Sequence, residues 1–156
     1  MKKLNIVKAN LSNLSHAEAI LHITNRYAND PMGMNRPLHD EVKSNLIEEM
    51  KAFSGTCCFI AFVDDQPAGV ANCFYGFSTF NAARLLNIHD LAVNPAFRSK
   101  GIGEALISAV EKEASENNCC KVTLEVREDN RARNLYERAG FEYGEPRMFF
   151  MSKSVS

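Results

Sequence analysis

Apolar residues recur along this chain at two spacings, one typical of helices and the other of strands. Helical spacing predicts helices over residues 14–23 (ended by Asn29-Asp30-Pro31), 42–50, 102–114 and about 131–139. Strand-like runs cover residues 4–9, 56–63, 68–77, 85–93 and 121–127, with short final strands at 141–143 and 147–151. Because hairpins and helical crossovers both occur, antiparallel and parallel pairs must share one mixed sheet. We expect a single α/β domain over residues 1–156, with six to seven strands and about four helices.

The junction between the strand at 85–93 and the helix at 102–114 holds the most informative residues, Arg98-Ser-Lys-Gly-Ile-Gly103. A strand that passes through a glycine turn into a helix leaves backbone N–H groups without an intrahelical acceptor. The helix dipole and the two cationic side chains favour an anion at the same place. The junction therefore predicts a phosphate-binding site.

Three patterns of phosphate-binding turn compete for this junction. A Walker loop requires Gly-x-x-x-x-Gly-Lys-Ser/Thr, and the chain has no such run. A dinucleotide fingerprint would begin at Gly101 and Gly103, but Leu106 stands where its third glycine belongs, although Glu125 is near the place for a ribose contact. The third pattern, Arg/Gln-x-x-Gly-x-Gly/Ala, is matched by Arg98, Gly101 and Gly103.

Composition excludes several function classes. The net charge of −1 does not favour a broad nucleic-acid interface. The N-terminal apolar run is too short for a signal peptide and no stretch approaches the length of a membrane span, so we expect a cytoplasmic protein without a membrane partner. The five cysteines (Cys57-Cys58, Cys73, Cys119-Cys120) indicate reduced, strand-buried thiols, and the four scattered histidines predict no metal site.

The strand at 85–93 carries two titratable residues, His89 and Asp90. Strict alternation would place His89 on one face with Leu91 and Val93, and Asp90 among aliphatic residues on the other. A carboxylate in that position needs hydrogen-bond partners. Each of the two residues is a candidate general base, and a structural role is open for each.

Two motifs about thirty residues apart resemble the GNAT superfamily of acetyl-CoA-dependent N-acetyltransferases. The first is His89-Asp-Leu-Ala-Val-Asn-Pro-Ala-Phe-Arg-Ser-Lys-Gly-Ile-Gly103. The second is Asn130-Arg-Ala-Arg-Asn-Leu-Tyr-Glu-Arg-Ala-Gly-Phe141, which is close to the family's Asn-x-x-Ala-x-x-Leu-Tyr-x-x-x-Gly-Phe. The resemblance covers roughly residues 68–141 and implies the GNAT fold, with acetyl-CoA as the acetyl donor.

The same resemblance implies roles for individual residues. Val93 would pair through its main chain with the pantetheine arm, and Leu91 would lie at the acetyl end of that strand. Tyr136 would act as a general acid that protonates the departing thiolate, and His89 aligns with a position where some relatives carry a glutamate near the acceptor amine. The residues that would contact the rest of the cofactor are Arg98, Ser99, Lys100, Gly101, Ile102, Gly103, Asn130 and Asn134.

The expected reaction is direct acetyl transfer to a primary amine, most simply that of a polyamine, an aminoglycoside or an amino-acid-like small molecule. A protein or peptide acceptor is one alternative, and a non-catalytic acyl-CoA-binding sensor and a nucleotide-binding domain are others. A homodimer is an expectation at the level of the family. Four aromatic residues beside the proposed acetyl site either wall an acceptor pocket or pack within a strand: Phe74, Tyr75, Phe77 and Phe80.

Overall fold

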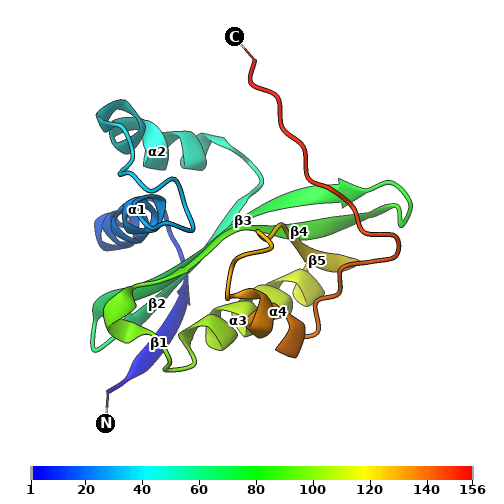
Figure 1. The fold of residues 1–156 in the computed structure, drawn as a ribbon. Coiled ribbons are helices and arrows are strands. Elements are labelled where there is room, and N and C mark those ends of the chain that lie inside the picture. The colour runs from blue at the N-terminus through cyan, green and yellow to red at the C-terminus, as the bar shows by residue number, and fades with distance from the viewer. Residues whose placement is uncertain (1, 156) are drawn as a thin grey trace.

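A computed structural model describes residues 2–155, so Met1 and Ser156, the ends of the expected domain, lie outside the described residues. The central feature is a five-stranded sheet in the order β1-β2-β3-β4-β5. Helices cover both faces, with α1 and α2 on one side and α3 and α4 on the other (Figure 1). The strands are β1 (Leu4–Lys8), β2 (Thr56–Val63), β3 (Gln66–Ser78), β4 (Ala83–Val93) and β5 (Lys121–Leu124). The helices are α1 (Leu14–Ala28), α2 (Asp40–Ala52), α3 (Ile102–Glu116) and α4 (Arg133–Arg138), with a 3-10 turn at Pro95–Phe97.

The expected α/β fold is confirmed, with two corrections to the strand count and lengths. The described part of the sheet has five strands instead of six to seven, because residues 141–143 and 147–151 form no strand. The fifth strand ends at Leu124, not at residue 127. The neighbouring pairs from β1 to β4 are antiparallel, and only β4 and β5 run parallel.

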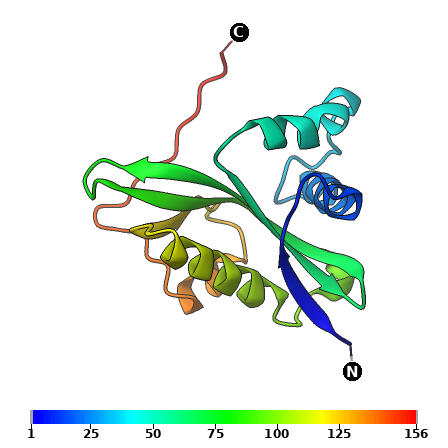
Figure 2. The same cartoon turned by 180° about the vertical axis from the view of Figure 1, so that it is seen from behind.

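Each face of the sheet has its own apolar core. Helix α3 runs along one face of the sheet (Figure 2), where its Leu106, Ile107 and Val110 pack with residues of β2, β3 and β4. On the other face, Ile20 and Ile23 of α1 pack on Ile60 and Val70. Both faces of the sheet are thus covered by helices. A functional site is therefore expected at the ends of the strands.

The cysteines follow the expectation only in part. All five are free thiols, and those of β2 and β3 are buried, where desolvation raises the pKa of Cys57 to about 11 and that of Cys58 to about 12. Cys119 is half-buried and Cys120 is exposed just before β5. These two are therefore not strand-buried, because the turn after α3 leaves them at the surface.

A β-bulge interrupts the alternation expected for β4. Asn72 of β3 is opposite Asp90, but the next residue, Cys73, is opposite Ile88, so His89 has no partner across the pair. The extra residue shifts the pleat by one position. Leu91 consequently packs on the α3 face together with Ile88, and not on the opposite face as strict alternation required. The prediction failed because a bulge depends on the neighbouring strand and not on the local sequence.

The bulge coincides with the point where β4 and β5 separate. Their parallel pairing covers Leu85 to Ile88 on β4 and Lys121 to Leu124 on β5. Beyond this point, within residues 2–155, the edge of β4 that faces β5 has no strand beside it. We call the gap between the two diverging strands the fork. The edge of β4 from Asp90 to Val93 leads from the fork toward the N-terminus of α3.

Candidate functional site

The turn before α3 is shaped to present backbone N–H groups. Ser99 and Gly101 have φ angles of 63° and 75°, in the left-handed region. Gly101 is the N-cap of α3, and no side chain caps the helix. The first amides of α3 therefore have no intrahelical acceptor, and left-handed residues in a turn are typical of concave anion sites. The phosphate site expected from the sequence has a physical basis in this geometry.

The two glycines of the turn serve different purposes. A Cβ at Gly101 would stand in nearly open space, 3.9 Å from Oε2 of Glu104, so this glycine is explained by its left-handed backbone. Gly103 is buried, and a Cβ there would lie 2.7 Å from Cδ2 of Leu135 in α4. The absence of a side chain at Gly103 lets α4 approach α3. This packing requirement for glycine cannot be inferred from the sequence motif.

Arg98 is engaged by a residue that sequence reasoning did not select. Its Nη2 lies 3.3 Å from Oδ2 of Asp30, just after α1. The pair borders a hollow of about 250 Å³ that is also lined by Tyr27, Val93 and Asn94. An anion at the turn must compete with Asp30 for this guanidinium. Lys100, in contrast, extends over the ring of Phe97 with its Nζ 5.7 Å from the ring centre.

Tyr136 lies inside the core on the α3 face and is only 8% exposed. Its ring meets Phe141 edge to face at 6.0 Å. Burial, with a smaller contribution from Tyr27, raises the pKa of Tyr136 to about 12. None of the side-chain hydrogen bonds among residues 2–155 involves the Tyr136 hydroxyl, and this oxygen is not among the fully buried polar atoms that lack a partner.

The bulge places His89 and Asp90 toward α1 and α2. His89 is exposed and meets the ring of Phe74 edge to face at 5.8 Å. Asp90 is half-buried, and its Oδ2 accepts a hydrogen bond of 3.0 Å from Nδ2 of Asn72. The same Nδ2 donates to Oγ1 of Thr24 in α1 at 3.0 Å.

Asn72 is the functional candidate that sequence reasoning missed. It is 2% exposed, and its Oδ1 has no hydrogen-bond partner, which is costly for a buried polar atom. In the sequence, this residue could have been noticed as a single asparagine within the apolar run of β3. Its amide fixes the side chain of Asp90 at the bulge, so the expected partner of the Asp90 carboxylate is now identified.

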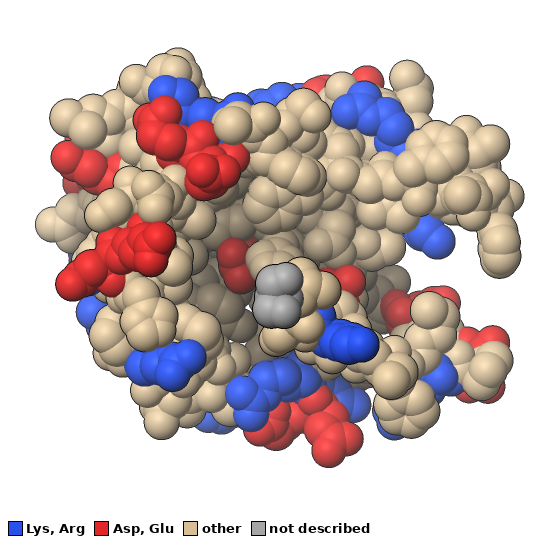
Figure 3. Space-filling model, turned by 90° about the horizontal axis from the view of Figure 1, so that it is seen from above, with Lys and Arg blue, Asp and Glu red and all other residues tan. Residues whose placement is uncertain are grey.

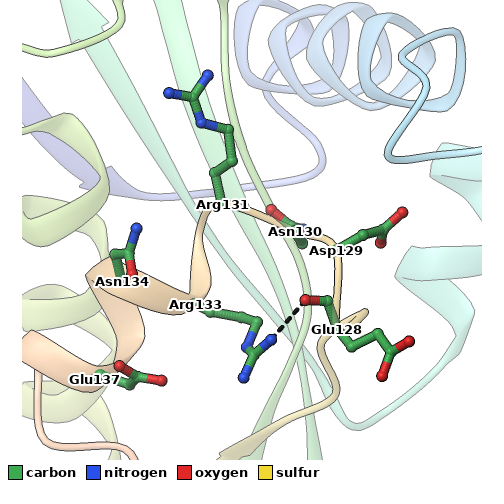
Figure 4. Close-up of a pocket in the computed structure, with 7 residues that line it drawn as sticks. All are labelled: Glu128, Asp129, Asn130, Arg131, Arg133, Asn134 and Glu137. Carbon is green, nitrogen blue, oxygen red and sulfur yellow. Dashed lines mark hydrogen bonds between the residues drawn. The ribbon is translucent and has the colours of Figure 1, made fainter.

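Asn130 and Asn134 border a polar hollow of about 380 Å³ at the start of α4 (Figure 4). Oδ1 of Asn130 accepts a hydrogen bond of 2.9 Å from the N–H of Ala132, so this side chain closes the turn before the helix. Asn134 is exposed. The other residues that line the hollow are Glu128, Asp129, Arg131, Arg133 and Glu137.

The four aromatic residues near the hairpin do not act as one group. Phe74 is half-buried between His89 and Phe53, whose ring centre lies 5.6 Å away. Tyr75 points to the α3 face, where its hydroxyl donates to Oε1 of Glu113 at 3.0 Å. The other two, Phe77 and Phe80, are exposed. Of the four, Phe74 is the one whose ring meets the candidate base His89.

Seen from above, the molecule has a hollow with acidic side chains gathered on one side of it and basic side chains on others (Figure 3). No cluster of three or more His, Cys, Asp or Glu residues in the described chain is arranged to bind a metal ion. None of the helices described is long and apolar enough to span a bilayer.

The chain is similar to known acetyltransferases in sequence and in fold. A family model described as the acetyltransferase (GNAT) family matches residues 19–141. The uncharacterized N-acetyltransferase YhfO of Bacillus subtilis (strain 168) is 37% identical over 84 residues, which span 53% of this chain and 56% of that protein. The match thus covers little more than half of that relative.

Two solved structures illustrate the range of similar folds. The aminoglycoside N-acetyltransferase AAC(6')-Iy in complex with CoA has a TM-score of 0.78 and 19% identity, covering 99% of this chain and 97% of that one. A ribosomal-protein-alanine N-acetyltransferase from Brucella melitensis biovar Abortus 2308 has a TM-score of 0.75 and 18% identity, covering 97% and 100%. At such identities the likeness establishes the fold alone.

Proposed function

Because this chain belongs to the acetyltransferase (GNAT) family, we propose that it transfers acetyl groups from acetyl-CoA to a primary amine of a small molecule. Acetyl-CoA supplies an acetyl group activated as a thioester. The observation that carries the proposal is the free edge of β4, which leads into the N-terminal turn of α3. An extended cofactor with a diphosphate needs a strand edge followed by an anion site, and this chain provides both in that order.

The cofactor would lie along the fork. The main chain of Val93 would pair with its amide-bearing arm, and Leu91 would flank the acetyl end. The diphosphate would accept hydrogen bonds from the first amides of α3 and from Ser99 and Lys100. Arg98 would leave Asp30 to reach the same anion, while Asn130 and Asn134 would border the cofactor from the α4 side.

Tyr136 would assist the departure of the thiolate. With a pKa of about 12, its hydroxyl is protonated at neutral pH and ready to donate. A thiol has a pKa of about 8.5, so complete transfer of the tyrosine proton would be uphill by roughly 3.5 units, or about 5 kcal/mol. We therefore assign Tyr136 mainly a hydrogen bond to the developing thiolate, with the full proton arriving later from solvent.

His89 and Asp90 would receive the acceptor amine on the other side of β4. An alkyl amine of pKa about 10.4 is neutral only about once in 2,500 molecules at pH 7, a cost of about 4.6 kcal/mol. Holding the amine next to the thioester supplies about 7–11 kcal/mol, so positioning outweighs the base. Asp90, held by Asn72, would orient the ammonium, and either Asp90 or the exposed His89 would take its proton.

The acidic side chains on one side of the hollow in Figure 3 favour a small cationic acceptor. A protein or peptide acceptor is the second candidate, since the fold is also similar to that of a ribosomal-protein-alanine acetyltransferase. Turnover with small amines compared with turnover with peptides distinguishes the small-molecule acceptor from the protein or peptide acceptor.

The test is a CoA-release assay with acetyl-CoA and, in parallel, polyamines, aminoglycosides and N-terminal peptides. Turnover with the small amines supports the proposal, and turnover with peptides alone would transfer the assignment to a protein acceptor. Tight CoA binding without turnover would instead indicate the acyl-CoA sensor. Thermal stabilisation by CoA, but not by NAD or ATP, excludes the nucleotide-binding alternative, because a ligand that binds the folded state raises apparent stability.

A further inference from the structure

Three polar side chains form a continuous bridge from α1 to the bulge of β4. Thr24 lies in α1, Asn72 in β3 and Asp90 in β4. Nδ2 of Asn72 donates to Oγ1 of Thr24 at 3.0 Å and to Oδ2 of Asp90 at 3.0 Å. Both N–H groups of this amide are therefore used, and each is bound by a different element of the fold.

The amide of Asn72 occupies its place at a cost to stability. The residue is 2% exposed, and its Oδ1 has no hydrogen-bond partner among the described residues. A buried acceptor without a donor destabilises the folded state, and an apolar side chain at this position would avoid that loss. The presence of asparagine is therefore explained by what its N–H groups hold. Such local violations of the folding rules are typical of functional sites.

Asp90 depends on this amide for its orientation. Within the described chain, its carboxylate forms no ion pair and no other side-chain hydrogen bond. Burial, with a smaller contribution from the charge of Asp90, raises the pKa of three surrounding groups, Tyr27 of α1, Cys58 of β2 and Cys73 of β3. All three are therefore uncharged at pH 7. The remaining titratable neighbour is His89, the preceding residue, which is exposed.

We propose that Thr24 and Asn72 are positioning residues, which keep the Asp90 carboxylate ionised and fixed in direction and so select it over His89 as the group that accepts the proton of the acceptor amine. The inference rests on the proposed acetyl transfer. The carboxylate accepts one proton from the ammonium, and the neutral amine keeps the lone pair that attacks the thioester carbon.

The two contacts of the amide specify its orientation together. An N–H that donates to a carboxylate favours the charged form of that carboxylate. Inverting the amide would place Oδ1 of Asn72 against an oxygen of Asp90, and Thr24 holds the second N–H from the side of α1. His89 has no comparable support, because its ring meets that of Phe74 and none of the side-chain hydrogen bonds of the described residues involves it.

The experiment compares Asn72→Ala with the wild-type protein in steady-state CoA release and in thermal unfolding. The variant should lower kcat by roughly 10- to 100-fold, keep the KM for acetyl-CoA, and move the acidic limb of kcat/KM to higher pH by about one unit. Its Tm should stay within about 2 °C of the wild-type value, since removal of the orphaned oxygen offsets the two lost hydrogen bonds. Thr24→Val should change kcat and the pH profile in the same direction by a smaller factor.

Ser78→Ala is the matched control. Ser78 is also a buried polar residue of β3, and its Oγ donates to Oδ1 of Asn81 at 2.8 Å in the hairpin turn. Its replacement should lower Tm by about 2–4 °C and leave kcat and the pH profile unchanged. A carbon-13 NMR titration of the Asp90 carboxyl group gives a readout without turnover, and its midpoint should rise by about one pH unit in Asn72→Ala.

Two results would overturn the inference. One is an Asn72→Ala protein with the wild-type kcat and pH profile. The other is a variant in which Tm and kcat fall together while the pH profile and the NMR midpoint stay constant, which would make the role of Asn72 structural. A wild-type protein that acetylates no amine would refute the proposed function instead. The NMR midpoint would then still decide whether the amide holds Asp90, and an unchanged midpoint would overturn that as well.

Discussion

Replacing Tyr136 by Phe separates a catalytic hydroxyl from a structural one. The substitution keeps the ring in the core and removes only an oxygen that makes no side-chain hydrogen bond within the described chain. The free energy of unfolding should therefore stay nearly constant. A hydrogen bond to a developing thiolate contributes about 1.5–3 kcal/mol, so kcat should fall by roughly 10- to 150-fold.

Tyr75→Phe is the matched control. Its hydroxyl donates to the buried carboxylate of Glu113, so it already has a structural partner. Removing it should cost about 1 kcal/mol of stability, or about 2–4 °C in Tm, and leave kcat unchanged. The assays are CoA release under saturating substrates and thermal unfolding by circular dichroism. If Tyr136→Phe keeps the wild-type kcat within experimental error, the role assigned to this hydroxyl is wrong.

Three further changes test the anion site and the fold. Asp30→Asn frees the guanidinium of Arg98 and should tighten CoA binding about two- to fivefold, as measured by calorimetry. The control is Glu116→Gln, which breaks the ion pair with Lys112 and should leave CoA binding unchanged. Gly101→Ala should weaken CoA binding by about tenfold, since it strains a left-handed residue at the proposed diphosphate site. Gly144→Ala, where φ is 77°, imposes the same strain elsewhere and should leave the affinity for CoA unchanged. Burial acts to raise the pKa of Glu113, but hydrogen bonds from a lysine and a tyrosine prevail and lower it. Because its pKa is lowered in the folded state, the Glu113 carboxylate stabilises the fold at pH values above the pKa it has in the unfolded chain, and this stabilisation is lost as the pH falls. Glu113→Gln should therefore reduce Tm by roughly 2–4 °C at pH 7 and by less below about pH 4.5. An equal decrease in Tm at both pH values would contradict this.

Local patterns were enough to locate most of the elements. The bounds of β2 match those expected from its apolar run, and α1 ends before the predicted Asn-Asp-Pro stop. The two motifs that resembled the GNAT superfamily are confirmed by the family match over residues 19–141. Helix periodicity, turn residues and a left-handed glycine at Gly140 are all set by neighbours in sequence, which is why they can be read without coordinates.

Two of the predictions that failed depended on partners distant in sequence. The two final strands were expected from composition, but a strand exists only when another strand accepts its hydrogen bonds, and none does so within the described chain. The alternation of β4 failed at His89 because the bulge is defined by its pairing with β3. The assignments of individual cofactor and catalytic residues remain predictions that the proposed experiments address.

The order of most helices and strands, the glycine turn before α3 and the family were present in the linear pattern, because each rests on interactions between residues a few positions apart. Three-dimensional packing alone settled where β4 and β5 part, that Asp30 holds Arg98, and that Asn72 holds Asp90. These contacts join residues separated by 18 to 68 positions. Their energies depend on distance in space, which the chain acquires only once its sheet and helices have been assembled.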